Sequence, residues 1–283
     1  MLVGLGQLRR GSFQRASPGA EPPDPTIDSC GQRYRPQLGW ADDDGVMSAE
    51  EERRSELRER LAAVRGRIGA ACRAVRRDPG EVTLVAVTKT FPASDVRLLY
   101  ELGVRDVGEN RDQEAAPKAA ECADLAPELS WHFIGQLQTN KAASVVRYAS
   151  VVHSVDRLRL VRALGEQARK VDRVITCLVQ VSLDGDTARG GVAEQGVADM
   201  SAAVAAEDGL RLGGVMAMAP LGVAPAQAFA PLPRIAAAVR ANHPEAVIVS
   251  AGMSGDLEDA IAAGATHVRV GTALLGGRPG FVR

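Results

Sequence analysis

A lysine stands at the point where a buried strand is expected to end. Lys89 follows the apolar and β-branched run of residues 84–88, and the turn-forming pair Phe91-Pro92 comes soon after it. A short apolar run bounded by turn signals predicts a fully buried strand. A desolvated lysine amine can lose its proton and attack a carbonyl carbon, whereas an arginine stays protonated and forms no imine. The run therefore predicts an imine-forming lysine; the alternative is a lysine whose amine reaches solvent at a strand end.

Lysine is rare in this chain, which makes the position of Lys89 informative. The chain has 34 Lys and Arg residues, but only four are lysines: Lys89, Lys118, Lys141 and Lys170. A lysine at a strand end in an arginine-dominated chain indicates that an amine is needed there.

Two loops of small residues can bind an anion. Residues 250–255 lead straight into a predicted helix, and Gly271-Thr272 follows the last predicted strand. Free N–H groups and the positive end of a helix suit a phosphate. The alternative is that Ser254 is only a helix N-cap and Gly271 only a turn residue. A phosphate site together with an imine-forming lysine predicts pyridoxal phosphate, or a phosphosugar handled as in an aldolase.

Arg269 is the third candidate group. It lies two residues before Gly271 on the last predicted strand, so strand alternation places both on one face. An arginine inside a barrel needs an acceptor, and a pyridine nitrogen can be one. The alternative is a salt bridge to Glu109 or another buried carboxylate. The other candidates at expected strand ends are Asn110, residues 132–136, residues 153–156, Ser182, residues 216–218 and residues 250–254.

Strands and helices alternate along the chain. Strands that are apolar throughout belong in a parallel sheet covered on both faces. Eight such units over roughly 200 residues predict an α/β fold, a single (β/α)8 TIM-type barrel, with its active face at the strand C-termini and its phosphate site after strands seven and eight. A doubly wound open sheet is the alternative, but no G-x-G-x-x-G follows the first strand. The expected strands are residues 84–89, 104–107, 131–134, 151–153, 174–181, 212–218, 246–250 and 267–270. The expected helices between them are residues 94–102, 111–122, 139–148, 156–170 with Asp156 as cap, 192–206, 226–241 and 254–263.

The chain before the first strand divides in two. Residues 1–46 contain five prolines and seven glycines without periodicity, and we expect a disordered or artefactual N-terminal extension. Ser48 to Glu51 fits a capping box and begins an extra N-terminal helix with one apolar stripe. We therefore expect residues 47–283 to form the barrel domain.

Composition excludes several classes of function. A net charge of −1 gives no electrostatic argument for nucleic acid or membrane binding. No apolar stretch is long enough to span a membrane, and the histidines lack metal-site spacing. The four cysteines are scattered, which indicates reduced thiols and a cytoplasmic protein; they are Cys30, Cys72, Cys122 and Cys177.

Five motifs resemble the pyridoxal-phosphate homeostasis protein family (YggS/PROSC type). The longest, Trp131 to Lys141, reads WHFIGQLQTNK and is specific. The resemblance covers about Met47 to Gly277 and implies a barrel similar to the N-terminal domain of alanine racemase. The other four motifs are residues 84–89, residues 108–110 with Gln113-Glu114, residues 252–254 with Asp256, and residues 268–273.

The resemblance implies a cofactor and the residues that bind it. Pyridoxal phosphate would be held as an imine on Lys89, with Asn110 near its ring and Arg269 facing the pyridine nitrogen. An arginine does not readily give up a proton, so that nitrogen would stay unprotonated and the ring would be a poor electron sink. The residues implied around the phosphate are Ser250, Ser254, Gly271 and Thr272, and Gly252 and Met253 are further implied cofactor-binding residues.

The chain departs from the family at two lysines. Phe91 stands where the family often has a second lysine, and Arg189 stands at another family lysine after the fifth strand. The sequence does not decide whether Asn140-Lys141 forms a second cofactor site.

These features predict a monomeric cytoplasmic protein that buffers pyridoxal phosphate or delivers it to apo pyridoxal-phosphate enzymes, with little or no turnover. An amino-acid racemase is the alternative. The racemase fold takes a catalytic tyrosine from a C-terminal domain, and this chain ends soon after Arg269. Tyr34, Tyr100 and Tyr148 lie at no expected strand C-terminus. A phosphosugar aldolase using Lys89 is the third hypothesis.

Overall fold

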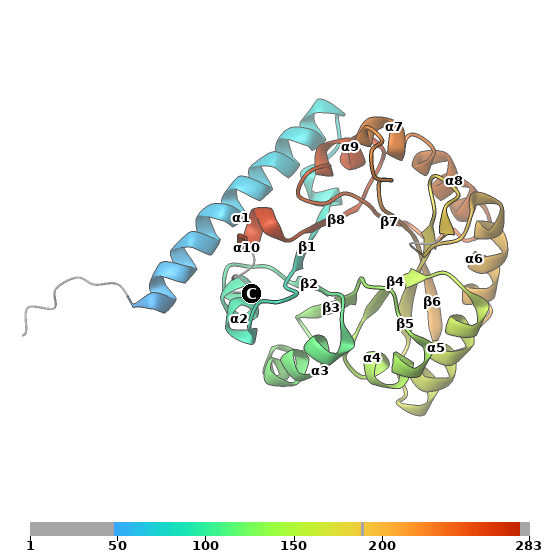
Figure 1. Cartoon of the computed structure of the whole chain (residues 1–283), viewed down its shortest axis with the longest axis horizontal. Helices are drawn as coiled ribbons and strands as arrows, with labels where there is room; N and C mark the ends of the chain where they lie inside the picture. The colour runs from blue at the N-terminus through green and yellow to red at the C-terminus, as the bar shows by residue number, and fades with distance from the viewer. Residues whose placement is uncertain (1–47, 188–189, 278–283) are drawn as a thin grey trace, which may run out of the picture. The chain divides into compact units, whose positions relative to one another are not determined.

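Eight parallel strands close into a barrel in which each strand pairs with the next along the chain, and the last pairs with the first (Figure 1). The computed structural model describes residues 48–187 and 190–277, so the expected extension of residues 1–46 lies outside the described residues. The closed sheet confirms the predicted (β/α)8 barrel. Its strands are β1 (Thr83–Val87), β2 (Asp106–Glu109), β3 (Ser130–Phe133), β4 (Val151–Val155), β5 (Ile175–Val181), β6 (Leu210–Ala217), β7 (Ile248–Ser250) and β8 (His267–Val270).

Helices cover the outside of the sheet (Figure 1). The segment expected as one helix over residues 226–241 forms two helices instead, because Pro231 has no N–H to continue the first one. The helices are α1 (Ala49–Ala74), α2 (Ala93–Glu101), α3 (Asp112–Glu121), α4 (Ala142–Tyr148), α5 (Leu158–Lys170), α6 (Val197–Ala205), α7 (Pro225–Phe229), α8 (Leu232–Asn242), α9 (Leu257–Ala262) and α10 (Thr272–Leu275).

The prediction that Asp156 caps the fifth helix is wrong. The N-cap of α5 is Arg157, and it makes no side-chain cap. The Asp156 carboxylate instead accepts hydrogen bonds from the Arg157 guanidinium at 2.5 Å and from the Gly191 N–H at 3.4 Å. A carboxylate with a charged donor beside it does not need the helix N-terminus.

Helix α1 begins as the sequence predicts. Ser48 and Glu51 form a capping box, in which each side chain accepts the other's backbone N–H. The helix lies beside α9 and α10 (Figure 1). Arg67 of α1 pairs with Glu258 of α9, and the apolar stripe of α1 is buried against the barrel. The extra helix thus covers the part of the barrel where the first and last strands meet.

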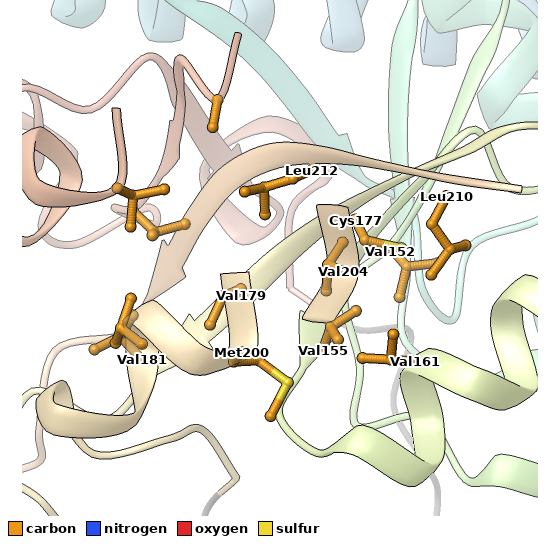
Figure 2. Packing of buried hydrophobic residues seen from close by; sticks show 14 of the residues in the cluster. Val152, Val155, Val161, Cys177, Val179, Val181, Met200, Val204, Leu210 and Leu212 are labelled. Carbon is orange, nitrogen blue, oxygen red and sulfur yellow. The ribbon is translucent and has the colours of Figure 1, made fainter. Parts of the chain in front are cut away.

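Strand alternation divides the side chains between the helices and the barrel interior. Residues facing outward pack under the helices, as Figure 2 shows for Val179 of β5 with Val204 and Met200 of α6. Residues facing inward are of two kinds. One apolar group consists of Val151, Leu178 and Met216. Polar side chains take other interior positions, and these lead to the candidate site.

The described residues also bear on the predictions about membrane spans and cysteine thiols. Within the two described ranges, no helix combines the length and the apolar character needed to cross a membrane. Cys72, Cys122 and Cys177 are buried free thiols.

Candidate functional site

Lys89 lies at the C-terminal edge of the barrel, beside the loop that follows β8. It stands two residues beyond Val87, the last residue of β1. The register pairs Val85 with Arg269, and a Cβ at Gly271 would lie 3.4 Å from the Val87 carbonyl oxygen. The structure therefore brings together the strand-one lysine, Arg269 and the loop at Gly271.

The residue before Lys89 is held by a buried ion pair. Lys118 of α3 donates to Glu109 Oε1 at 2.5 Å and to the Thr88 carbonyl oxygen at 2.8 Å. The Thr88 hydroxyl donates to the same Glu109 oxygen at 2.7 Å. Burial raises the pKa of Glu109, and the Lys118 ammonium opposes that rise. In the described part of the chain, Glu109 Oε2 has no hydrogen-bond partner.

The residue after Lys89 is held by a second carboxylate. Thr90 has a φ of 70°, in the left-handed region that non-glycine residues rarely adopt. Its N–H donates to Glu114 Oε2 at 3.2 Å. Both neighbours of Lys89 are therefore fixed by side chains of β2 and α3, which determines the path of the turn that carries the lysine.

The loops after β7 and β8 lie against each other. The Ala273 N–H donates to Ser254 Oγ at 3.3 Å, and the Arg269 N–H donates to the Gly252 carbonyl at 2.9 Å. Helix α9 begins only at Leu257 with Asp256 as N-cap, so the alternative that Ser254 is a helix N-cap is wrong. Donors of these loops, rather than the end of a six-residue helix, are what an anion would meet.

Several groups in these loops are available as donors. Among the described residues, no acceptor is recorded for the backbone N–H groups of Ser254, Gly255 and Thr272. The Thr272 side chain is exposed. Met253 differs, because its N–H donates to Asp256 Oδ1 at 2.5 Å.

Gly252 is required by the shape of its loop. Its φ is 89°, and a Cβ there would lie 2.7 Å from the Ala260 side chain. Any side chain would therefore strain the backbone and displace α9. The glycine allows the loop to turn tightly over the start of that helix.

Arg269 is buried inside the barrel and has two acceptors. Its Nη1 donates to Ser250 Oγ at 2.5 Å, and its Nη2 donates to the Ala217 carbonyl at 2.9 Å. The alternative of a salt bridge to Glu109 is wrong, since Glu109 faces outward and pairs with Lys118. Burial lowers the pKa of Arg269 to about 10, so the guanidinium keeps its charge at neutral pH. Ser250 is therefore linked to the candidate site by the hydrogen bond that it accepts from Arg269.

Asn110 lies on the same edge of the barrel, in contact with the loop after β3. A Cβ at Gly135 would lie 2.2 Å from the Asn110 carbonyl oxygen, so the two backbones touch. Beside them is a cleft of about 510 Å³ whose lining includes Asn110, Gln136 and Lys141. The Lys141 amine lies 3.8 Å from Asp112 Oδ2. Arg189, named for its family position, lies outside the described residues.

Two histidines in the barrel interior were not assigned a role from the sequence. His132 and His153 hydrogen-bond to each other at 2.8 Å, and His153 also contacts Ser250. In the described residues, no group of three His, Cys, Asp or Glu side chains is arranged to hold a metal ion. The only sequence signal was their place at two expected strand ends, which named them as candidates and nothing more.

Known proteins resemble this chain in sequence and in fold. A family model described as alanine racemase, N-terminal domain, matches residues 60–279. The pyridoxal phosphate homeostasis protein of Mycobacterium tuberculosis H37Rv is 47% identical over 250 residues, covering 82% of this chain and 96% of that protein. The structure of PipY from Synechococcus elongatus with PLP bound is 36% identical, with a TM-score of 0.68 over 78% of this chain and 100% of that one. Alanine racemase of Corynebacterium glutamicum, 17% identical with a TM-score of 0.56 over 79% of this chain and 62% of its own, shares the fold.

Proposed function

Since the chain belongs to the pyridoxal phosphate homeostasis protein family, whose barrel is the alanine racemase N-terminal domain, we propose that it binds pyridoxal phosphate and buffers or delivers it. The cofactor is held as an imine on Lys89, and turnover is small or absent. The observation that carries the proposal is the convergence of Lys89, Arg269 and the two donor loops at one edge of the barrel.

The residues present fit the phosphate of this cofactor. Within the described residues, the N–H groups of Ser254, Gly255 and Thr272 have no acceptor, and together with the Thr272 hydroxyl they offer donors to a phosphate. Gly252 allows the first loop to turn tightly, because a side chain there would meet Ala260 of α9. Backbone N–H groups on a tight loop are a common phosphate-binding device.

The residues present also fit the ring. Pyridoxal phosphate supplies an electron sink to bound amines when its pyridine nitrogen is protonated. Arg269 is charged and is a donor only, so it favours an unprotonated nitrogen as acceptor. Asn110 lies at the same edge and can contact the ring substituents. This arrangement supports holding the cofactor more than carbanion chemistry.

The described tyrosines support a carrier over a racemase. Tyr100 donates its hydroxyl to Glu128, and Tyr148 lies beside Asp112, with its pKa raised by burial. Neither lies on the edge of the barrel that carries Lys89 as a free acid or base.

A transfer experiment tests the proposal. The protein is loaded with pyridoxal phosphate, desalted and mixed with an apo aminotransferase, and the aminotransferase activity and alanine racemisation are both followed. We expect activation of the apo enzyme and no racemisation above a protein-free control. Failure to retain pyridoxal phosphate contradicts the proposal, and steady racemisation favours the enzyme alternative.

The expected partners and setting are part of the same proposal. Apo pyridoxal-phosphate enzymes are the recipients, the protein is a cytoplasmic monomer, and neither nucleic acid nor a membrane is a partner. Size-exclusion chromatography with light scattering tests the oligomeric state, and a stable dimer contradicts it.

A further inference from the structure

A row of polar side chains crosses the barrel interior from Arg269 to Asp106. Arg269 Nη1 lies 2.5 Å from Ser250 Oγ, which lies 3.0 Å from His153 Nδ1. His153 Nε2 lies 2.8 Å from His132 Nδ1, and His132 Nε2 lies 3.0 Å from Asp106 Oδ1. These five residues, here called the interior chain, come from five different strands.

With Asp106 ionised and both histidine rings neutral, the two ends fix the direction of every hydrogen bond between them. A guanidinium only donates and a carboxylate only accepts. Ser250 Oγ therefore accepts from Arg269 and must give its own proton to His153 Nδ1. His153 then donates from Nε2 to His132.

The same condition sets the hydrogen bonds at the Asp106 end of the interior chain. His132 accepts at Nδ1, so its proton lies on Nε2, where Asp106 accepts it. In this neutral arrangement both histidines carry the proton on Nε2. The competing assignment has a charged His132 that donates from both nitrogens, with Ser250 Oγ accepting from both Arg269 and His153.

Burial removes water as a substitute partner. Arg269, Ser250, His153 and His132 are each at most 5% exposed. Burial also lowers the pKa of His153 well below its usual range, with the neighbouring His132 and Arg269 adding to the effect. A charged His153 would donate from both ring nitrogens. Its Nδ1 would then no longer accept the proton of the Ser250 hydroxyl.

The interior chain places polar residues at interior positions that an apolar side chain could fill. Elsewhere the interior is filled by Val151, Leu178 and Met216, which shows that this barrel accepts an apolar filling. Polar residues occupy the positions that supply Arg269 with an oriented acceptor. A second acceptor, the Ala217 carbonyl, receives Nη2, so two nitrogens define the plane of the guanidinium.

We propose that His153 and His132 are positioning residues for Arg269, and that the interior chain holds the guanidinium in the orientation that meets a pyridine nitrogen. The identity of the ligand rests on the proposed function. The direction of the interior chain does not, because it follows from the protein alone.

The first test needs no variant and no cofactor. Nitrogen NMR of ¹⁵N-histidine-labelled apo protein reports which ring nitrogen carries the proton. We expect His132 and His153 to be neutral Nε2–H tautomers. A proton on Nδ1 of either interior histidine, or a charged ring, overturns the inference. The NMR measurement tests the inference even if wild-type protein fails to bind pyridoxal phosphate. That failure would refute only the proposed function.

A double-mutant cycle tests the action through Arg269. His153→Leu fills the site but breaks the interior chain, whereas His153→Gln offers one acceptor and one donor and should restore it. We expect His153→Leu to speed release of pyridoxal phosphate by about tenfold, the scale of one hydrogen bond to a charged group. His153→Gln should stay near wild type.

The background variant Arg269→Gln supplies the decisive comparison. If His153 acts through Arg269, His153→Leu should change the release rate by less than about twofold in that background. An equal effect in both backgrounds, or no rescue by His153→Gln, overturns the positioning role. His243→Leu is the matched control and should match wild type in both assays.

Discussion

The ammonium group of Lys118 lies 2.5 Å from Glu109 Oε1, and the same nitrogen donates to the carbonyl of Thr88, the residue before Lys89. The pair is buried, with side-chain exposures of 8% and 0%. The position of Lys89 is therefore linked to an ion pair between β2 and α3. This relationship leads to the first prediction.

Replacing one partner of the pair should be costly. Lys118→Met leaves the Glu109 carboxylate buried without its cation, and loss of about 3–5 kcal/mol in the free energy of unfolding is expected. Urea unfolding measures it. The double variant Glu109→Gln/Lys118→Met removes both charges and should recover part of that loss. Equal stability of Lys118→Met and wild type would contradict the account of this pair.

The contact between Gly135 and Asn110 gives a prediction with a close control. Gly135→Ala would place a Cβ 2.2 Å from the Asn110 carbonyl oxygen, whereas a Cβ at Gly255 meets nothing within 4 Å. We expect Gly135→Ala to shift the Asn110 loop, lower the melting temperature and weaken pyridoxal phosphate binding. Gly255→Ala is the control for stability alone and should leave the melting temperature unchanged. Absorption titration and thermal unfolding measure binding and stability, and similar melting temperatures of the two variants would argue against a role for the loop contact.

The Thr272 hydroxyl should distinguish the phosphate from the rest of the cofactor. Thr272→Val keeps the shape of the side chain and the backbone N–H but removes one donor. We expect about tenfold weaker binding of pyridoxal phosphate, the scale of one charge-assisted hydrogen bond. Binding of pyridoxal, which has no phosphate, should not change. A loss of the same size for both ligands would place Thr272 away from the phosphate.

His267 should make stability depend on pH. Burial lowers its pKa from 6.5 to about 4, and the nearby His132 adds to the shift. The unfolded chain therefore takes up a proton near pH 6.5 while the folded protein does not. The free energy of unfolding should fall between pH 6.5 and pH 4, by up to about 3 kcal/mol from this residue. His267→Gln should remove that part of the slope, and an unchanged slope would refute the assignment.

The sequence predicted the fold because the strands are apolar and the breaks between them are clear. Residues 267–270 were expected as a strand and are β8, and the capping box at Ser48 begins α1. Lys89 and Arg269 could be named because a charged group at the end of an apolar strand is conspicuous. These signals are local, so one sequence is sufficient to detect them.

The polar partners could not be predicted because they depend on how helices rotate against the sheet. Glu109 was considered as a partner for Arg269, but it points outward, where α3 brings Lys118 to it. The strand expected at residues 104–107 lies two residues later, at Asp106–Glu109. Likewise, Asp156 pairs with its neighbour Arg157 and also accepts from the Gly191 N–H in the loop after β5, a long-range contact with no local signal.

The most direct test of the central claim is to locate the lysine that holds the cofactor. Wild-type protein is incubated with pyridoxal phosphate, reduced with borohydride, digested and analysed by mass spectrometry, beside Lys89→Ala. The chain has four lysines, so the modified peptide identifies one of Lys89, Lys118, Lys141 and Lys170. We predict modification at Lys89 in stoichiometric amount, and loss of both the label and the visible absorption band in Lys89→Ala. A label at another lysine, or an equal label in the variant, would contradict the assignment of the cofactor to the C-terminal edge of the first strand.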